Sequence, residues 1–214
     1  FLQAIEFYRA AISSDPNYAQ AHNNLGLALE QLGQIDAAID SFKQALQIDP
    51  RLYQAHCNLG NALLSLGQVK PAIECFQRSL QINPQQSEAL CDLAHALDIS
   101  GQTQNAIEYY RQALVLAPDS AEIWCNLGES SQRIGRYDDA IRCQNRAIAC
   151  KPDLAMAHNN LGSVLSFLGK FDSALRSYHR ALEIQPDFSG AQSGLIFIQN
   201  YLPEKSAENM LAEA

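Results

Sequence analysis

The sequence predicts an all-α protein built from stacked helical hairpins, and two observations support this. The first is a period: six of the eight prolines follow one another at intervals of 34 residues, at positions 16, 50, 84, 118, 152 and 186. The second is the residue pattern within each period, which has the spacing of amphipathic helices and not of strands. A repeat of this length is one supersecondary unit, and it buries its apolar face only by stacking on its neighbours.

The repeat can be numbered so that the recurring proline is position 32. The chain then contains five complete units, which span residues 19–52, 53–86, 87–120, 121–154 and 155–188. Residues 1–18 correspond to the second half of a preceding unit. Residues 189–214 begin a sixth unit with a capping helix and then diverge from the pattern.

Each unit reads as a first helix at positions 1–14 and a second helix at positions 18–31. Small residues at positions 8, 20 and 27 let the helices approach closely, and an aromatic residue at position 24 fills the space beside them. Glycine at position 15 suits a left-handed helix end, and proline at position 32 stops the second helix. The fourth complete unit departs most, because Ser130, Ser131 and Gln144 replace apolar residues. We expect looser packing, a bend or a tolerated defect there.

This pattern resembles that of the tetratricopeptide repeat (TPR) family and covers nearly the whole chain. Position 7 carries the leucines of the family pattern, and position 20 carries its alanines. These are Leu25, Leu59, Leu93, Leu127, Leu161 and Leu195, and Ala4, Ala38, Ala72, Ala106, Ala140 and Ala174. The resemblance implies a right-handed superhelical solenoid of TPR hairpins. It also implies a protein-binding scaffold with the first helices on its concave side.

The composition excludes some kinds of partner. The formal net charge is −8 at pH 7, from 15 Lys and Arg against 23 Asp and Glu. Nucleic-acid binding needs a basic surface that displaces counterions from phosphates, so we expect no nucleic-acid partner. The acidity favours neutral or basic polypeptides, although acidity that only keeps the protein soluble would look the same. No apolar stretch approaches the roughly 20 residues of a membrane span, so we expect no membrane partner.

The six cysteines form no Cys-x-x-Cys pair, so the sequence shows no zinc or redox motif. A helical chain of this length does not need disulfides, which favours a reducing, cytoplasmic location. Cys57, Cys91 and Cys125 share position 5 of the repeat. Equivalent residues of stacked repeats should lie about 10 Å apart, which is too far for a disulfide. We therefore expect a row of free thiols.

Candidates for catalysis or metal binding are few. His22, His56 and His158 share position 4, where a half-buried packing role is expected and not a metal site. Gly162 and Gly169 are separated by six residues where a phosphate-binding loop has four. No Ser-His-Asp triad or paired carboxylates can be assembled, so the sequence predicts no enzyme activity, cofactor or metal for this chain.

The candidate binding residues share position 6 of the first helix and are Asn24, Asn58, Asp92, Asn126 and Asn160. Asparagine is a poor helix former, so its recurrence needs a reason. A carboxamide both donates and accepts, and it can pair with the backbone of any extended polypeptide. The alternative is that these residues brace the neighbouring helix. Asp92 interrupts the row, since a carboxylate cannot donate, and Gly194 replaces its sixth member.

The first helices carry almost no positive charge. Their only Lys or Arg is Arg133. The chaperone-binding members of the TPR family hold a C-terminal carboxylate with Lys and Arg at positions 2, 5 and 6. Those positions are neutral or acidic here, so the resemblance does not extend to a carboxylate clamp.

Two features resemble one branch of the family, the O-linked N-acetylglucosamine (O-GlcNAc) transferase and SPINDLY group. One is the short motif His-Asn-Asn-Leu-Gly at residues 22–26 and 158–162, which recurs as His-Cys-Asn-Leu-Gly at residues 56–60. The other is the segment 195–208, which is similar to the linker that joins repeats to a glycosyltransferase domain. The resemblance implies an acceptor-recognition region, with residues 189–214 leading toward a downstream catalytic domain. The alternative is a free-standing TPR scaffold in an assembly unrelated to glycosylation.

Overall fold

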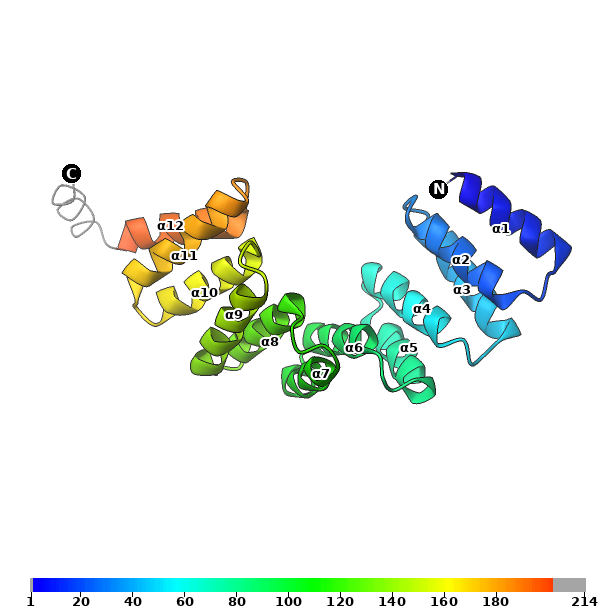
Figure 1. Ribbon diagram of the computed structural model, residues 1–214, viewed down its shortest axis with the longest axis horizontal. Coiled ribbons are helices and arrows are strands. Elements are labelled where there is room, and N and C mark those ends of the chain that lie inside the picture. Colours follow the sequence, from blue (N-terminus) through cyan, green and yellow to red (C-terminus); the bar gives the residue numbers. More distant parts are fainter. Residues whose placement is uncertain (1, 202–214) are drawn as a thin grey trace. The chain divides into compact units, whose positions relative to one another are not determined.

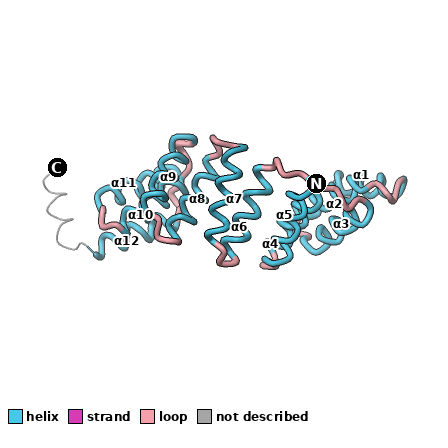
Figure 2. The backbone as a smooth tube through the Cα atoms, turned by 90° about the horizontal axis from the view of Figure 1, so that it is seen from below, coloured by secondary structure: helices cyan, strands magenta, loops and turns pink. Residues whose placement is uncertain are grey.

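A computed structural model describes residues 2–201. In that part of the chain it contains helices joined by turns and no strand (Figure 1; Figure 2). The predicted linker beyond Tyr201 lies outside the described residues. In chain order the helices are α1 (Leu2–Ser14), α2 (Ala19–Glu30), α3 (Ile35–Ile48), α4 (Tyr53–Ser65), α5 (Val69–Ile82), α6 (Ser87–Ile99), α7 (Thr103–Leu116), α8 (Ala121–Arg133), α9 (Tyr137–Cys150), α10 (Ala155–Phe167), α11 (Phe171–Ile184) and α12 (Ser189–Tyr201).

The helices pack as hairpins. The most extensive contacts join α2 to α3, α4 to α5, α6 to α7, α8 to α9 and α10 to α11. The predicted all-α class of helical hairpins is therefore confirmed. The chain divides into two compact units, Phe1–Leu116 and Ala117–Ala214, which we call unit 1 and unit 2.

The turn inside each hairpin depends on its glycine. Gly33, like its equivalents at 67, 101, 135 and 169, has a positive φ, between 71° and 85° across the five. This is the left-handed conformation predicted for position 15, which other residues adopt at a steric cost. The second helices begin at position 17, one residue earlier than predicted. The reason is that the carbonyl at position 16 already accepts a helical bond, as Ala38 N to Gln34 O (3.0 Å) shows.

The core of each repeat lies between its two helices and is built around small residues. In the first complete repeat, Ala38, Phe42 and Ala45 are fully buried. A Cβ added to Gly26 would lie 2.7 Å from Cδ1 of Phe42, so only glycine lets that ring lie flat against α2. In the fourth repeat α8 runs unbroken through Ser131, whose buried hydroxyl donates to Leu127 O (2.7 Å).

Candidate functional site

The first helices of successive repeats adjoin within each unit. Helix α4 contacts α2 and α6 in unit 1, and α10 contacts α8 and α12 in unit 2. Each unit therefore presents a continuous surface of first helices, which we call its first-helix face. The position-6 residues predicted to bind polypeptide lie on these two faces.

On the first-helix face of unit 1, side-chain hydrogen bonds cross from one repeat to the next. Asn58 Nδ2 donates to Asn23 Oδ1 (2.9 Å), and Asn61 Nδ2 donates to Asp92 Oδ2 (3.2 Å). Asn24 Oδ1 accepts from Asn23 Nδ2 (3.4 Å). The predicted residues Asn24, Asn58 and Asp92 are all half-buried, and each belongs to this set of bonds.

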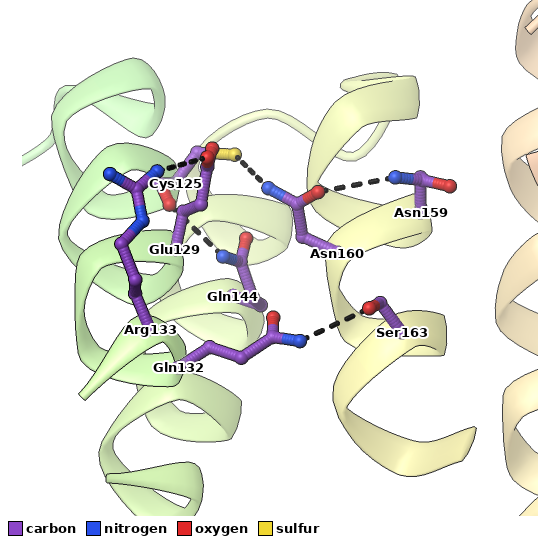
Figure 3. A network of polar contacts seen from close by, with 8 residues as sticks. All are labelled: Cys125, Glu129, Gln132, Arg133, Gln144, Asn159, Asn160 and Ser163. Atoms are coloured by element: carbon purple, nitrogen blue, oxygen red, sulfur yellow. Dashed lines mark hydrogen bonds and ion pairs between the residues drawn. The ribbon is translucent and has the colours of Figure 1, made fainter. Parts of the chain in front are cut away.

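Unit 2 repeats the same geometry (Figure 3). Asn160 Nδ2 points to Cys125 Sγ (3.5 Å), so position 6 again meets position 5 of the preceding repeat. Asn160 Oδ1 accepts from Asn159 Nδ2 (3.2 Å), and Asn160 is only 8% exposed. The predicted residue Asn126 is half-buried. At Asn58 and Asn160 the bracing role that the sequence left open is thus present in the fold.

A hollow of about 610 Å³ lies beside this network, between α8 and α10. We call it the α8–α10 hollow. It is lined by Glu129, Gln132, Arg133, Tyr137, Met156, Asn159, Asn160, Ser163 and Phe167. Gln132 Nε2 donates across it to Ser163 Oγ (3.1 Å). Polar groups from two repeats therefore converge with large apolar side chains at one place.

Sequence reasoning selected only Asn160 from this hollow. It missed Gln132, Asn159 and Ser163, which lie at positions 12, 5 and 9 of their repeats. A signal was present, because these positions point away from the core stripe of the helix. Position 6 drew attention by its repetition, whereas the residues at the other positions vary from one repeat to the next.

Charge differs between the two faces. The first helices of unit 1 carry Glu30, Glu88, Asp92 and Asp98 and no Lys or Arg. Burial raises the pKa of Asp92, the hydrogen bond from Asn61 opposes that shift, and the negative charge of Glu88 adds to it. On the first helices of unit 2 both acids have partners. Glu122 pairs with Lys151 (3.4 Å), and Glu129 pairs with Arg133 (3.1 Å).

The cysteines are free thiols, as predicted. Burial raises the pKa of Cys125 to about 12 and that of Cys75 to about 11. Burial also raises the pKa of Cys57, whose Sγ lies 3.0 Å from Ser79 Oγ. A protonated thiol is a poor nucleophile, so these side chains serve as small packing groups. Within residues 2–201, no group of His, Cys, Asp and Glu side chains is arranged to hold a metal ion.

The position-4 side chains have a structural role beyond packing. His56 Nε2 and His158 Nε2 each lie 3.0 Å from the carbonyl of the proline six residues earlier, and Trp124 Nε1 donates to Pro118 O (2.8 Å). His22 makes the same contact with Pro16 O (3.2 Å). A carbonyl only accepts, so these imidazole nitrogens carry the proton. In these four repeats, position 4 thus ties the first helix to the end of the preceding repeat, whereas Leu90 at the same position of α6 has no polar atom to do so.

Comparison with known families agrees with this architecture. Models of the tetratricopeptide repeat together match the chain without a gap from residue 2 to residue 187. The matched segments are 2–33, 19–52, 53–86, 75–108, 99–135 and 119–187. The chain therefore belongs to the tetratricopeptide repeat family. Among curated proteins, none matches the sequence.

Several solved structures share the fold. YrrB, described as a TPR protein with an unusual peptide-binding site, is 22% identical over 87% of this chain and 96% of its own, with a TM-score of 0.71. MamA is 25% identical over 77% of this chain and 96% of its own, with a TM-score of 0.70. A chain of the APC/C hetero-tetramer Cut9-Hcn1 is 22% identical over 92% of this chain and 39% of its own, with a TM-score of 0.80. These likenesses establish the fold. In residues 2–201, moreover, every helix is too short or too polar to cross a membrane.

Proposed function

We propose that the chain is a non-catalytic scaffold that binds other polypeptides in extended conformation along its first-helix faces. The observation that carries this proposal is the recurrence of amide side chains at position 6 of the first helices, two of which are fixed by hydrogen bonds to the preceding repeat. Asn58 to Asn23 and Asn160 to Cys125 are the two clearest links. YrrB, which shares the fold, is described as having a peptide-binding site.

Amides suit this function because they pair with the peptide backbone whatever the ligand sequence. Neighbouring first helices should present such groups about 10 Å apart, and an extended chain advances about 3.3 Å per residue. One repeat then serves about three ligand residues. Each pairing contributes on the order of 0.5–1.5 kcal/mol, so several are needed to offset the ordering of the peptide.

The preferred ligand is neutral or basic. The first helices of unit 1 carry acids without a Lys or Arg to balance them. An acidic ligand would meet like charges there, and a C-terminal carboxylate would find no Lys or Arg clamp. We place this binding in a reducing, cytoplasmic compartment, on the grounds of the free thiols.

The test is a variant in which Asn58, Asn126 and Asn160 become alanine. It is measured against synthetic peptides of about twelve residues selected from a random display library on the parent chain. We expect binding to weaken by roughly tenfold or more for peptides of unrelated sequence, since backbone pairing is lost. A matched control changes Asn105 and Asn145, exposed amides on second helices, to alanine.

The bracing bonds make a stability measurement necessary beside the affinity. If the triple variant folds and still binds as tightly as the parent, these residues do not contact the ligand and their assignment is wrong. A lowered unfolding midpoint in that case would show that position 6 serves to brace the repeats. If the control weakens binding equally, the ligand lies on the other side of the hairpins. Either result is read from one titration and one urea unfolding curve for each variant.

A narrower proposal is that the chain is the acceptor-recognition region of a glycosyltransferase that resembles O-GlcNAc transferase. It is supported by the His-Asn-Asn-Leu-Gly motifs at residues 22–26 and 158–162 and by the sequence of segment 195–208. The part of that segment beyond Tyr201 lies outside the described residues. YrrB, MamA and Cut9-Hcn1 are not described as glycosyltransferases, so the free-standing scaffold has the better support. Sequencing the coding region beyond the codon for Ala214 distinguishes the two.

Under either version we propose that this chain alone transfers no sugar. Calorimetry with a nucleotide sugar at about millimolar concentration should show no saturable heat. At that concentration the titration would detect a site with a binding free energy as weak as about −4 kcal/mol. Saturable binding would mean that the chain carries an active site of its own.

A further inference from the structure

We propose that the α8–α10 hollow is a specificity pocket that takes one uncharged apolar side chain of the bound polypeptide. The inference rests on the proposed scaffold function and adds a preference for ligand sequence. It assigns roles to Met156, Phe167 and Tyr137, which lie outside the row of position-6 residues. The occupant is an extended polypeptide segment with a leucine-sized or aromatic residue at its centre.

The apolar wall of the hollow faces solvent. Phe167 is 67% exposed and Met156 is 44% exposed, although both belong to an otherwise well-packed α10. The ring of Tyr137 packs against Phe167, with centroids 4.7 Å apart and planes at 32°. A ring that is already held by another ring loses little freedom when a ligand covers it. Exposed apolar surface beside a groove is typical of a recognition site.

The polar wall is set for a peptide backbone. Gln132 uses one amide hydrogen on Ser163 Oγ, and Asn159 uses one on Asn160 Oδ1, as Figure 3 shows. A carboxamide has two amide hydrogens and an accepting oxygen. Each therefore retains groups that can pair with a ligand N–H or C=O. Asn160 is held by Asn159 and Cys125, and these two bonds fix the orientation of its amide in this wall.

The charges in the hollow indicate which side chain is accepted. Glu129 and Arg133 lie on the same wall, and their carboxylate and guanidinium are 3.1 Å apart. A charged ligand group near this ion pair would be repelled by one of the two charges while it is attracted by the other, and it would also lose hydration. An uncharged apolar side chain has neither penalty and covers Phe167 and Met156. Charge complementarity therefore favours a neutral residue, in contrast to the acidic first helices of unit 1.

The experiment uses the full chain and peptides of about twelve residues selected on it from a random display library. We expect the selected sequences to share an apolar residue, and its replacement by serine should lower affinity by roughly tenfold. Phe167→Ser should lower the affinity of the parent peptide by a similar factor. It should leave the serine-substituted peptide almost unaffected, because the two changes remove the same contact. Phe167→Leu should retain most of the affinity.

The matched control is Val115→Ser. Val115 is 81% exposed on the second helix α7 and does not line the hollow, so the change removes surface apolarity outside the pocket lining. Its affinity should equal that of the parent. Since Phe167 is exposed, Phe167→Ser should also keep the parent's unfolding midpoint, which separates lost recognition from lost folding.

Four outcomes would overturn the pocket. Peptides could bind with no apolar preference and no response to Phe167→Ser, which leaves the scaffold function intact. The shared residue could be acidic and depend on Arg133, which would make the site a charge receptor. Phe167→Ser could convert a dimer to a monomer in sedimentation, which would make the hollow a contact between copies of this chain. If no peptide is selected at all, the scaffold function fails together with the pocket.

Discussion

At the scale of single residues, position 24 shows how one side chain is matched to its neighbour. Phe76 lies across Gly60, where an added Cβ would come within 2.6 Å of its ring. In the fourth repeat this place is taken by Gln144, which is fully buried opposite Gly128. Its Nε2 donates to Cys125 O (3.0 Å), while its Oε1 has no hydrogen-bond partner among the described residues.

Replacing Gln144 by phenylalanine should therefore stabilise the protein. A buried acceptor without a partner costs about 1–3 kcal/mol, and a ring over Gly128 would restore the arrangement seen at Phe76 and Gly60. Urea unfolding should show a higher midpoint with an unchanged slope. The control Asn145→Phe, at the next and exposed position of α9, should bring no gain. A lower midpoint for Gln144→Phe would show that the ring does not fit.

Asp92 is the second residue that departs from its repeat, since it stands where the others carry asparagine. The groups around it are Asn61, Glu88, His95 and Cys57, and burial is the main cause of its raised pKa. A carboxyl group with a higher pKa in the folded state than in the unfolded state binds its proton more tightly when folded. Its ionisation therefore lowers stability as the pH rises above the unfolded value of about 3.9.

Asp92→Asn should be more stable than the parent at pH 7. Asparagine can still accept from Asn61 through Oδ1, and it removes a buried charge next to Glu88. The advantage should shrink as the pH falls through and below about 4, where the parent carboxyl is protonated in both states. Unfolding free energies measured at several pH values test this. A difference that stays constant with pH would show that the charge of Asp92 is not its cause.

At the scale of helices, the backbone of α12 packs directly against a side chain of α11. Tyr178 on α11 lies between Gly162 on α10 and Gly194 on α12. A Cβ at Gly194 would lie 2.6 Å from Cε1 of Tyr178, and one at Gly162 would lie 2.8 Å from the same atom. This explains why Gly194 interrupts the row of position-6 amides, because a side chain there would push α12 away from the core of unit 2.

Gly194→Ala should consequently destabilise the protein, by about 1–3 kcal/mol, because the added methyl group overpacks the Tyr178 contact. Gly190→Ala, in the first turn of the same helix, is the matched control. Its Cβ would meet only the ends of the Phe188 and Asn159 side chains, at 3.1 and 3.2 Å. Alanine is the better helix former by at most about 1 kcal/mol, so this change should be neutral or stabilising. Equal losses in thermal unfolding would refute the packing explanation.

At the scale of the whole chain, the net charge of −8 bears on how a ligand is found. Surface charge attracts oppositely charged ligands over distances set by the Debye length, about 8 Å at physiological salt. It acts mainly on the association rate, because contacts formed in the complex decide the dissociation rate. The protein should therefore capture basic peptides faster than neutral ones.

Two lysines can be added to a selected peptide at positions other than its shared apolar residue. They should raise the association rate constant of the peptide by several-fold at low salt. The dissociation rate should change little, and the gain should fade as sodium chloride is raised. Stopped-flow mixing of labelled peptide with the full chain measures both rates. An adjacent pair of aspartates in place of the lysines should slow association. A salt-independent gain would show that the lysines make direct contacts.

Much of the fold could be predicted because it is local and repeated. The glycine at position 15 determines the turn, and the small residues at positions 8, 20 and 27 determine which helix surfaces meet. The binding site was harder to predict from the sequence. Position 6 lies on the first-helix face, but its repetition did not reveal that Asn58 and Asn160 already bond to the preceding repeat. Its role in ligand binding stays a prediction.

The sequence by itself determined the class of protein, the repeat period, the helical hairpins and the left-handed glycine turns. These follow from interactions within about one repeat, where spacing along the chain fixes which groups meet. Only the tertiary structure decided which amides brace the repeats and which face solvent, and that Phe167 and Tyr137 meet beside Gln132 at the α8–α10 hollow. The physical reason is that these contacts join residues about 30 positions apart (Gln132 and Ser163 are an example), and the packing of neighbouring helices sets their distances.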